Sequence, residues 1–201
     1  LYPNWRGSFK LNKVELCKEF QLKSIPNLKG EYSSVFDGDL RQPIKGFEVN
    51  IQLMEEAVPI FHKAYPIPFK LREKVEEELK RLVKVEILMP TTVSEWASPV
   101  VIVPKPNGNI RLCVDCSVTV NKFIKTIHYP LPVIDEVLAD LVDCNYFVLL
   151  DLKGAFTQLQ LSSQAQKLTV INTHIGLFVY KRLIFGIKPA ASIFQSVMDT
   201  I

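Results

Sequence analysis

The chain has 201 residues, of which 48% are hydrophobic, so it is long enough to bury one sizeable core. Lys and Arg number 24 against 21 Asp and Glu, and the formal net charge of +3 permits a polyanionic partner without requiring one. The longest apolar runs, such as residues 146–150, are far too short to cross a bilayer, and four cysteines favour a reducing compartment over a disulfide scaffold.

The first part of the chain shows no long hydrophobic period. Short apolar clusters alternate with Asn, Ser, Gly and Pro over residues 1–65, so we expect a loosely structured lead-in with one helix around residues 13–20. Several prolines in residues 59–68 mark an extended boundary. The sequence therefore predicts two parts, a lead-in of residues 1–65 and a main domain of residues 66–201.

A helical pattern follows the prolines. Apolar residues recur at helical spacing from Leu71 to Val83, and Glu76 stands four residues before Lys80 on the polar side. Pro90 stops any continuation. The pattern predicts an amphipathic helix over residues 71–83.

From Ser98 the pattern changes to that of strands. Residues 100–103 are a β-branched run, the Pro-Asn-Gly-Asn stretch at 106–109 is a turn, and residues 110–114 form the returning strand. These three segments predict a hairpin.

The last third of the chain mixes helical and strand patterns. Residues 133–141 indicate a second amphipathic helix, and the apolar run at 146–150 fits a strand that is buried on both faces. Residues 168–172 and 177–183 indicate a second hairpin, and residues 190–201 a final helix. The expected fold class is α+β, without internal repeats.

Asp151 directly follows the apolar run, where burial of a carboxylate is costly without a cationic partner. A hard divalent metal ion is one such partner. Asp is also a favoured N-cap residue, and Asp151 stands just before a possible helix start at residues 153–156. The local pattern favours the cap and leaves the metal ligand open.

Five segments occur in an order that carries more information than any one of them. The stretches SEWASPVV at 94–101, VPKPNGNIRLCVD at 103–115, YPLP at 129–132, LLDLKGAFTQL at 149–159, and Phe185-Gly186 through Phe194-Gln195 follow one another. In order and rough spacing they resemble the reverse transcriptases of gypsy-type LTR retrotransposons. Residues 149–159 resemble the first catalytic motif of that family, and residues 103–115 its finger hairpin.

The resemblance implies a right-hand polymerase fold with fingers and a partial palm, truncated before the second catalytic motif. Residues 1–65 would correspond to the lead-in between protease and polymerase. The implied function is that of an RNA-directed DNA polymerase segment of a Pol polyprotein, a nucleotidyltransferase. In the intact parent it would add dNTPs to a primer 3′-hydroxyl by two-metal phosphoryl transfer.

The family holds two Mg²⁺ ions, or Mn²⁺, on three aspartates, and Asp151 matches the first of them. The other two belong to an aromatic-x-Asp-Asp turn, which the resemblance places after the helix that contains Phe194 and Gln195. No Asp-Asp pair occurs in the sequence. We therefore expect these 201 residues not to polymerise DNA on their own.

Lys105 and Arg111 flank the first turn and, by resemblance, bind the incoming triphosphate. Arg offers a planar fork for paired phosphate oxygens, and Lys a mobile point charge. The alternative is an ordinary solvated hairpin with two surface cations.

Five further residues receive roles from the resemblance alone. Phe156, five residues past the first catalytic aspartate, would pack under the deoxyribose and exclude a 2′-hydroxyl, although a core aromatic is the commoner fate of Phe. Phe185 and Gly186 would line the nucleotide site. Gln158 and Gln195 would contact the template-primer, or else be polar surface.

Four positions depart from the family pattern. Tyr65 stands where Arg is common, Cys116 replaces an aromatic residue, Ile184 replaces a Pro, and Pro189 is displaced from its usual order. Together with the missing aspartates they indicate a decayed or fragmentary copy. An alternative function is therefore a non-catalytic remnant that binds template-primer or a protein.

The expected partners are an RNA or DNA template-primer and dNTPs, with no membrane. The first 25 residues lack the pattern of a secretory signal, so we expect a protein that is not secreted. The resemblance places such a protein in the cytoplasm, within a virus-like particle, or in the nucleus.

Overall fold

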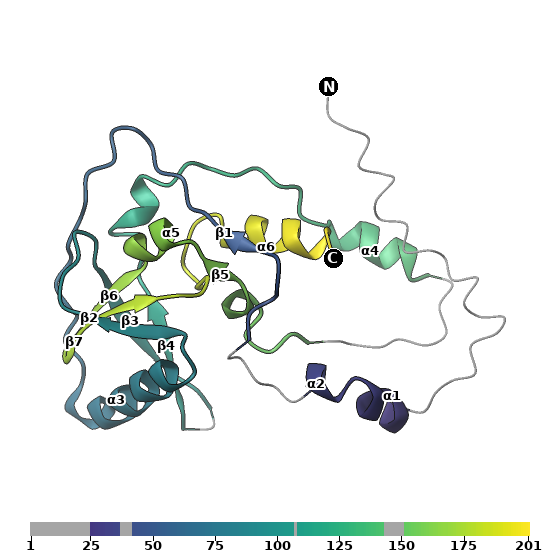
Figure 1. Ribbon diagram of the computed structural model, residues 1–201, viewed down its shortest axis with the longest axis horizontal. Coiled ribbons are helices and arrows are strands. Elements are labelled where there is room, and N and C mark those ends of the chain that lie inside the picture. The colour runs from purple at the N-terminus through teal and green to yellow at the C-terminus, as the bar shows by residue number, and fades with distance from the viewer. Residues whose placement is uncertain (1–24, 37–41, 107, 143–150) are drawn as a thin grey trace. The chain divides into compact units, whose positions relative to one another are not determined.

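The computed structural model describes residues 25–36, 42–106, 108–142 and 151–201. The chain divides into two compact units, Leu1–Asp39 and Leu40–Ile201. The described part of the first unit consists of helices α1 (Ile25–Glu31) and α2 (Ser33–Phe36) (Figure 1). The predicted helix near residues 13–20 and the predicted strand at 146–150 lie outside the described residues.

The second unit is built on a five-stranded sheet with the order β2-β7-β6-β3-β4. Its strands are β2 (Leu88–Thr91), β3 (Ser98–Pro104), β4 (Ile110–Val114), β6 (Val170–Thr173) and β7 (Gly176–Tyr180). All neighbours are antiparallel except β3 and β6, which pair in parallel. Both hairpins predicted from the sequence are therefore present.

β3 changes its partners along its length. Ser98 and Pro99 pair with β6, whereas residues 100–104 pair with β4. β6 therefore covers only the first two residues of β3, and within the described ranges no third strand pairs with the far end of the hairpin on that side. Val101 and Val103 are accordingly 42% and 43% exposed.

Part of the predicted lead-in packs within the second unit. β1 (Glu48–Val49) pairs in parallel with β5 (Gln160–Leu161), and Phe61 forms a bridge to Ala97. The division between the units at residues 39 and 40 thus does not coincide with the boundary predicted at residues 65 and 66.

The second unit contains four α-helices and two short 3-10 helices among its described residues. They are α3 (Phe69–Lys84), η3 (Val120–Lys122), α4 (Ile134–Asp140), η4 (Ala155–Gln158), α5 (Ser163–Leu168) and α6 (Ala190–Met198). The three helices predicted in this unit are confirmed as α3, α4 and α6. Leu168, predicted to begin a strand, instead ends α5, whose first turn is capped by the Ser162 hydroxyl.

α3 runs along one side of the sheet, and α5 lies on the other side in the view of Figure 1. The buried face of α3 carries Val75, Leu79 and Leu82, at the spacing that the sequence indicated. These side chains join a core cluster that also includes Ile87 and Ile171. No helix in the described ranges has both the length and the apolar character needed to cross a membrane.

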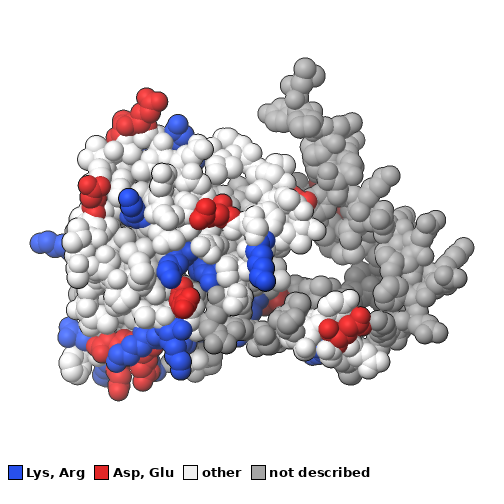
Figure 2. Space-filling view, viewed as in Figure 1, with Lys and Arg blue, Asp and Glu red and all other residues white. Residues whose placement is uncertain are grey.

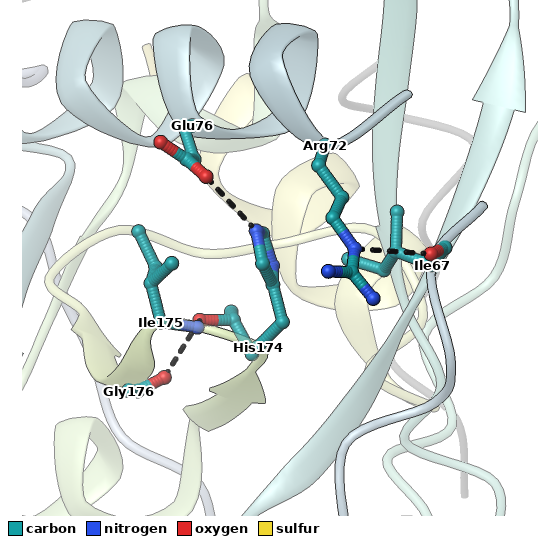
Figure 3. Close-up of polar contacts among 7 residues, drawn as sticks. Ile67, Arg72, Glu76, His174, Ile175 and Gly176 are labelled. Carbon is teal, nitrogen blue, oxygen red and sulfur yellow. Dashed lines mark hydrogen bonds and ion pairs between the residues drawn. The ribbon is translucent and has the colours of Figure 1, made fainter. Parts of the chain in front are cut away.

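Two polar contacts attach the first half of α3 to other segments (Figure 3). His174, in the turn between β6 and β7, lies 3.3 Å through Nε2 from Glu76 Oε1, and Arg72 Nε donates to the Ile67 carbonyl at 3.4 Å. The first contact joins α3 to the second hairpin, and the second joins it to the segment before the helix. His174 therefore has a structural role.

The packing of α3 gives a stability prediction. Leu79 is 1% exposed, so Leu79→Ala should lower the free energy of unfolding by about 2–5 kcal/mol through lost apolar burial and a residual cavity. Lys80→Ala, one residue further on the exposed side, should change it by less than about 0.5 kcal/mol. Urea denaturation followed by circular dichroism measures both. Equal losses would contradict the assignment of Leu79 to the core.

Candidate nucleotide site

The first hairpin places Lys105 and Arg111 on either side of its turn. Lys105 N donates to the Asn109 carbonyl at 2.7 Å, and Arg111 pairs across the ladder with Val103. Both cationic side chains belong to exposed residues. The turn is tethered to α3, since Lys74 Nζ donates to the Gly108 carbonyl at 2.7 Å.

The two cations share a cavity of about 140 Å³ with side chains from other elements. Thr157 of η4 and Phe185, beyond β7, form part of its wall. The other lining residues are Glu78, Leu82, Ile87, Ile110, Leu112, Val114, Tyr180 and Ile184. Ligand pockets usually measure about 300–1,000 Å³, so this cavity can hold part of a nucleotide and not all of it.

Phe156 lies at the centre of an aromatic group beside this cavity. Its ring centroid is 4.4 Å from that of Phe185 and 5.4 Å from that of Phe194. Phe156 is half-buried and packs against the core, whereas Phe185 is 65% exposed. The core role and a position next to the cavity are therefore compatible, and the sugar-excluding role of Phe156 stays a prediction.

The structure excludes one of the two local interpretations of Asp151. The helix that follows it is η4, and the N-cap position of η4 is Gly154, with φ of 59°. Asp151 is therefore not the cap, and its side chain is exposed.

The described residues provide an incomplete metal site. They contain no group of three or more His, Cys, Asp or Glu that could hold a metal ion. Mg²⁺ requires a nearly octahedral set of oxygens, usually from one or two carboxylates with phosphates and water. Asp151 can supply one such oxygen donor, so the residues present do not by themselves fit a two-ion centre.

Both predicted template-primer residues have partners within the chain. Gln158 Nε2 donates to the Lys153 carbonyl at 3.0 Å, and Gln195 Nε2 donates to Asp199 Oδ1 at 2.7 Å. The other Asp199 oxygen accepts from the Tyr129 hydroxyl at 2.6 Å, and this bond raises the pKa of Tyr129. A template-primer role for either glutamine stays a prediction.

The departures at Tyr65 and Cys116 are accommodated by specific contacts. The Tyr65 hydroxyl donates to Asp115 Oδ2 at 3.2 Å, while Ser117 Oγ donates to Asp115 Oδ1 at 2.5 Å. The Ser117 hydroxyl, followed by the Tyr65 hydroxyl, holds the pKa of Asp115 below its usual range. Burial raises the pKa of the Cys116 thiol to about 12, which makes it unreactive.

Sequence reasoning missed Asn121, which contacts the Phe185-Gly186 segment. Asn121 Nδ2 donates to the Gly186 carbonyl at 2.6 Å, and the Lys188 amide donates to Asn121 Oδ1 at 2.9 Å. These bonds join a side chain to backbone groups more than sixty residues away. No periodicity or motif spacing signals such contacts, so the sequence offered no means of finding them.

Basic and acidic side chains are mixed on the visible surface of the second unit. Figure 2 shows Lys and Arg interspersed with Asp and Glu around α3, rather than a surface of one sign. On α3, two guanidinium nitrogens of Arg81 bind the two carboxylate oxygens of Glu78, each at 2.7 Å. This ion pair neutralises charge locally on α3.

Gly186 approaches the backbone more closely than any other amino acid could. Its φ is 98°, and a Cβ at this position would lie 2.6 Å from the Val114 carbonyl oxygen. Gly108 has a similar φ of 77° but open space around it. Alanine at Gly108 would therefore introduce backbone strain alone, whereas alanine at Gly186 would add a steric overlap with the Val114 carbonyl.

We expect Gly108→Ala to lower the free energy of unfolding by about 1–2 kcal/mol, from the left-handed backbone alone. Gly186→Ala should cost a further 1 kcal/mol or more, roughly, because the Val114 carbonyl must also move. Thermal melting of both variants tests this. A smaller loss for Gly186→Ala than for Gly108→Ala would disprove the close approach.

Comparison with known proteins places these residues in a family context. A family model described as reverse transcriptase (RNA-dependent DNA polymerase) matches residues 103–201. An uncharacterized protein of Caenorhabditis elegans is 39% identical over 99% of this chain and 16% of its own length. The retrovirus-related Pol polyprotein from transposon opus of Drosophila melanogaster is 34% identical over 88% of this chain and 18% of its own length. The chain thus spans less than a fifth of these relatives.

Solved structures give the fold. The prototype foamy virus protease-reverse transcriptase (CSH mutant) superposes with a TM-score of 0.75 at 24% identity, over 86% of this chain and 23% of its own. The foamy viral protease-reverse transcriptase in complex with RNA/DNA hybrid gives a TM-score of 0.69 at 20% identity, over 85% of this chain and 23% of its own. These similarities confirm the predicted right-hand polymerase fold of the α+β class.

Proposed function

We propose that this chain, which belongs to the reverse transcriptase family of retrotransposon Pol polyproteins, forms the fingers and the first part of the palm of an RNA-directed DNA polymerase. One observation carries the assignment of the site. Lys105 and Arg111 of the hairpin line a single cavity with Phe185, which lies more than seventy residues further along the sequence, and Phe156 packs on Phe185. The order of the motifs and the transposon relatives support a gypsy-type parent element.

Lys105 and Arg111 bind the triphosphate of the incoming dNTP. The guanidinium can donate two parallel hydrogen bonds to phosphate oxygens, and the lysine ammonium adds a point charge on the other side of the turn. Because the cavity holds only part of a nucleotide, the remainder lies over Phe185 and toward Phe156. Catalysis by these groups is mainly positioning of the dNTP against the primer.

A bound magnesium or manganese ion would supply Lewis-acid activation of the primer 3′-hydroxyl and charge stabilisation at the phosphate. Among the described residues, Asp151 is the candidate ligand: its side chain is exposed, and it does not cap η4. A complete site needs further carboxylates, because the described residues contain no group of three or more His, Cys, Asp or Glu that could hold a metal ion.

The partners of the whole protein are a template-primer of RNA or DNA together with dNTPs. The similarity to a structure solved with an RNA/DNA hybrid supports the template-primer. Gln158 and Gln195 are the candidate contacts, and each would have to exchange an internal hydrogen bond for one to the nucleic acid. That exchange keeps the hydrogen-bond count constant and so costs little net free energy.

We expect Arg111→Ala to weaken dATP binding to the 201-residue chain roughly tenfold, by removing a charge-assisted hydrogen-bonding group. The melting temperature should stay nearly unchanged, because Arg111 is exposed. Equilibrium dialysis with labelled dATP measures the dissociation constant. Arg72→Ala is the matched control: it removes the same charge from an exposed residue of α3 that does not line the cavity. Equal weakening of dATP binding in both variants would show that the effect arises from the change in net charge alone.

Phe156→Val should relax the exclusion of ribonucleotides. If the ring blocks the 2′-hydroxyl, its truncation lowers the dNTP-to-rNTP ratio of specificity constants about tenfold or more. The assay uses a polymerase that joins residues 1–201 to the downstream palm of a retrotransposon relative.

Phe194→Val provides the control for Phe156→Val. Phe194 packs on the same Phe156 ring and does not line the cavity, so its truncation removes aromatic packing without opening the sugar site. It should depress the use of both sugars alike. If Phe156→Val behaves in the same way, Phe156 is a core residue only.

A further inference from the structure

Asn121 connects the segment after β4 to the turn that carries Phe185. It lies in η3 and bonds two backbone groups of one turn, the Gly186 carbonyl at 2.6 Å and the Lys188 amide at 2.9 Å. A carbonyl can only accept and a backbone N–H can only donate, so these partners fix the orientation of the Asn121 amide. No other neutral side chain of this size offers a donor and an acceptor in the same plane.

The same turn is restrained from a second direction. Gly186 Cα approaches the end of β4 so closely that a Cβ would lie 2.6 Å from the Val114 oxygen. Val114 and Asn121 lie a few residues apart at the two ends of one short connection. The turn is therefore held at two points by the same stretch of chain, which defines its place relative to β4.

Phe185 has little else to hold it. Its side chain is 65% exposed, yet its ring centroid lies 4.4 Å from that of Phe156 and its side chain lines the cavity with Lys105 and Arg111. A ring that is mostly in solvent gains little from burial. Its position therefore depends on the backbone of the adjacent turn, and that backbone is bonded to Asn121.

We infer that Asn121 is a positioning residue of the nucleotide pocket. It locks the Gly186–Lys188 turn, keeps the Phe185 ring against Phe156, and so sets how strongly the pocket prefers deoxyribose to ribose. The selectivity part rests on the proposed function of this pocket, whereas the positioning part does not.

The positioning part is tested in the isotope-labelled 201-residue chain without nucleotide. Asn121→Ala should speed exchange of the Lys188 amide about tenfold and abolish the nuclear Overhauser effect between the Phe156 and Phe185 rings. Asn121→Asp should also abolish the ring contact, since a carboxylate of nearly the same size cannot donate to the Gly186 carbonyl. Asn172→Ala is the control: Asn172 Nδ2 donates to the His62 carbonyl at 3.0 Å, away from the pocket. It should leave both signals unchanged.

The selectivity part is tested with dATP and ATP on the same variants. Asn121→Ala should lower the ratio of the ATP to the dATP dissociation constant about threefold or more, and Asn172→Ala should not. Unchanged ring contact and Lys188 exchange in Asn121→Ala would overturn the positioning role. Loss of the ring contact with an unchanged ratio would overturn the selectivity role. If the wild-type chain binds neither nucleotide, the proposed function of the pocket and the selectivity role fail together, while the ring and exchange data still decide the positioning role.

Discussion

The parallel pairing of β3 with β6 is the contact on which the rest of the unit depends. Only Ser98 and Pro99 take part on the β3 side, and they join the first hairpin to a strand far along the chain. Because β7 returns from β6, this pairing also carries the segment after β7 to the hairpin, where Phe185 meets the wall formed by Lys105 and Arg111. The candidate site is thus a product of topology, because the β3–β4 hairpin with Lys105 and Arg111 meets Phe185 only through pairing between distant strands.

Local patterns predicted the parts of the fold that local forces determine. The amphipathic helix α3 and the hairpin of β3 and β4 follow from hydrophobic period and a turn, and both are present. The pairing of β1 with β5 was not predictable, because two-residue strands have no period and their partners are far away. In the site, the nucleotide-binding role of Lys105 and Arg111 was predicted from the family resemblance. The role of Asn121 was not predicted, because hydrogen bonds from a side chain to distant backbone groups leave no pattern in the sequence. Asp151 shows the converse: its cap role, favoured by the local sequence, is excluded by Gly154 at the start of η4.

The departures from the family pattern are compatible with a well-packed chain. Tyr65 retains a hydrogen bond to Asp115, Cys116 is 1% exposed, and Ile184 is 4% exposed and lines the cavity. A random substitution in a core usually leaves a void or an unsatisfied polar group. These three side chains are instead buried or hydrogen-bonded, so they do not disrupt the packing, and Ile184 forms part of the pocket wall.

The tether between Lys74 and Gly108 has a mechanical consequence for the hairpin. A hydrogen bond at an exposed site contributes about 1 kcal/mol or less net, which thermal motion breaks readily. Once it is broken, the outer hairpin is joined to the remainder of the sheet through Ser98 and Pro99. Bending at that point would move the side chains of Lys105 and Arg111 away from Phe185 without separating β3 from β4. The bond between Lys74 and Gly108 is therefore one of the contacts that hold the cationic side of the cavity to α3.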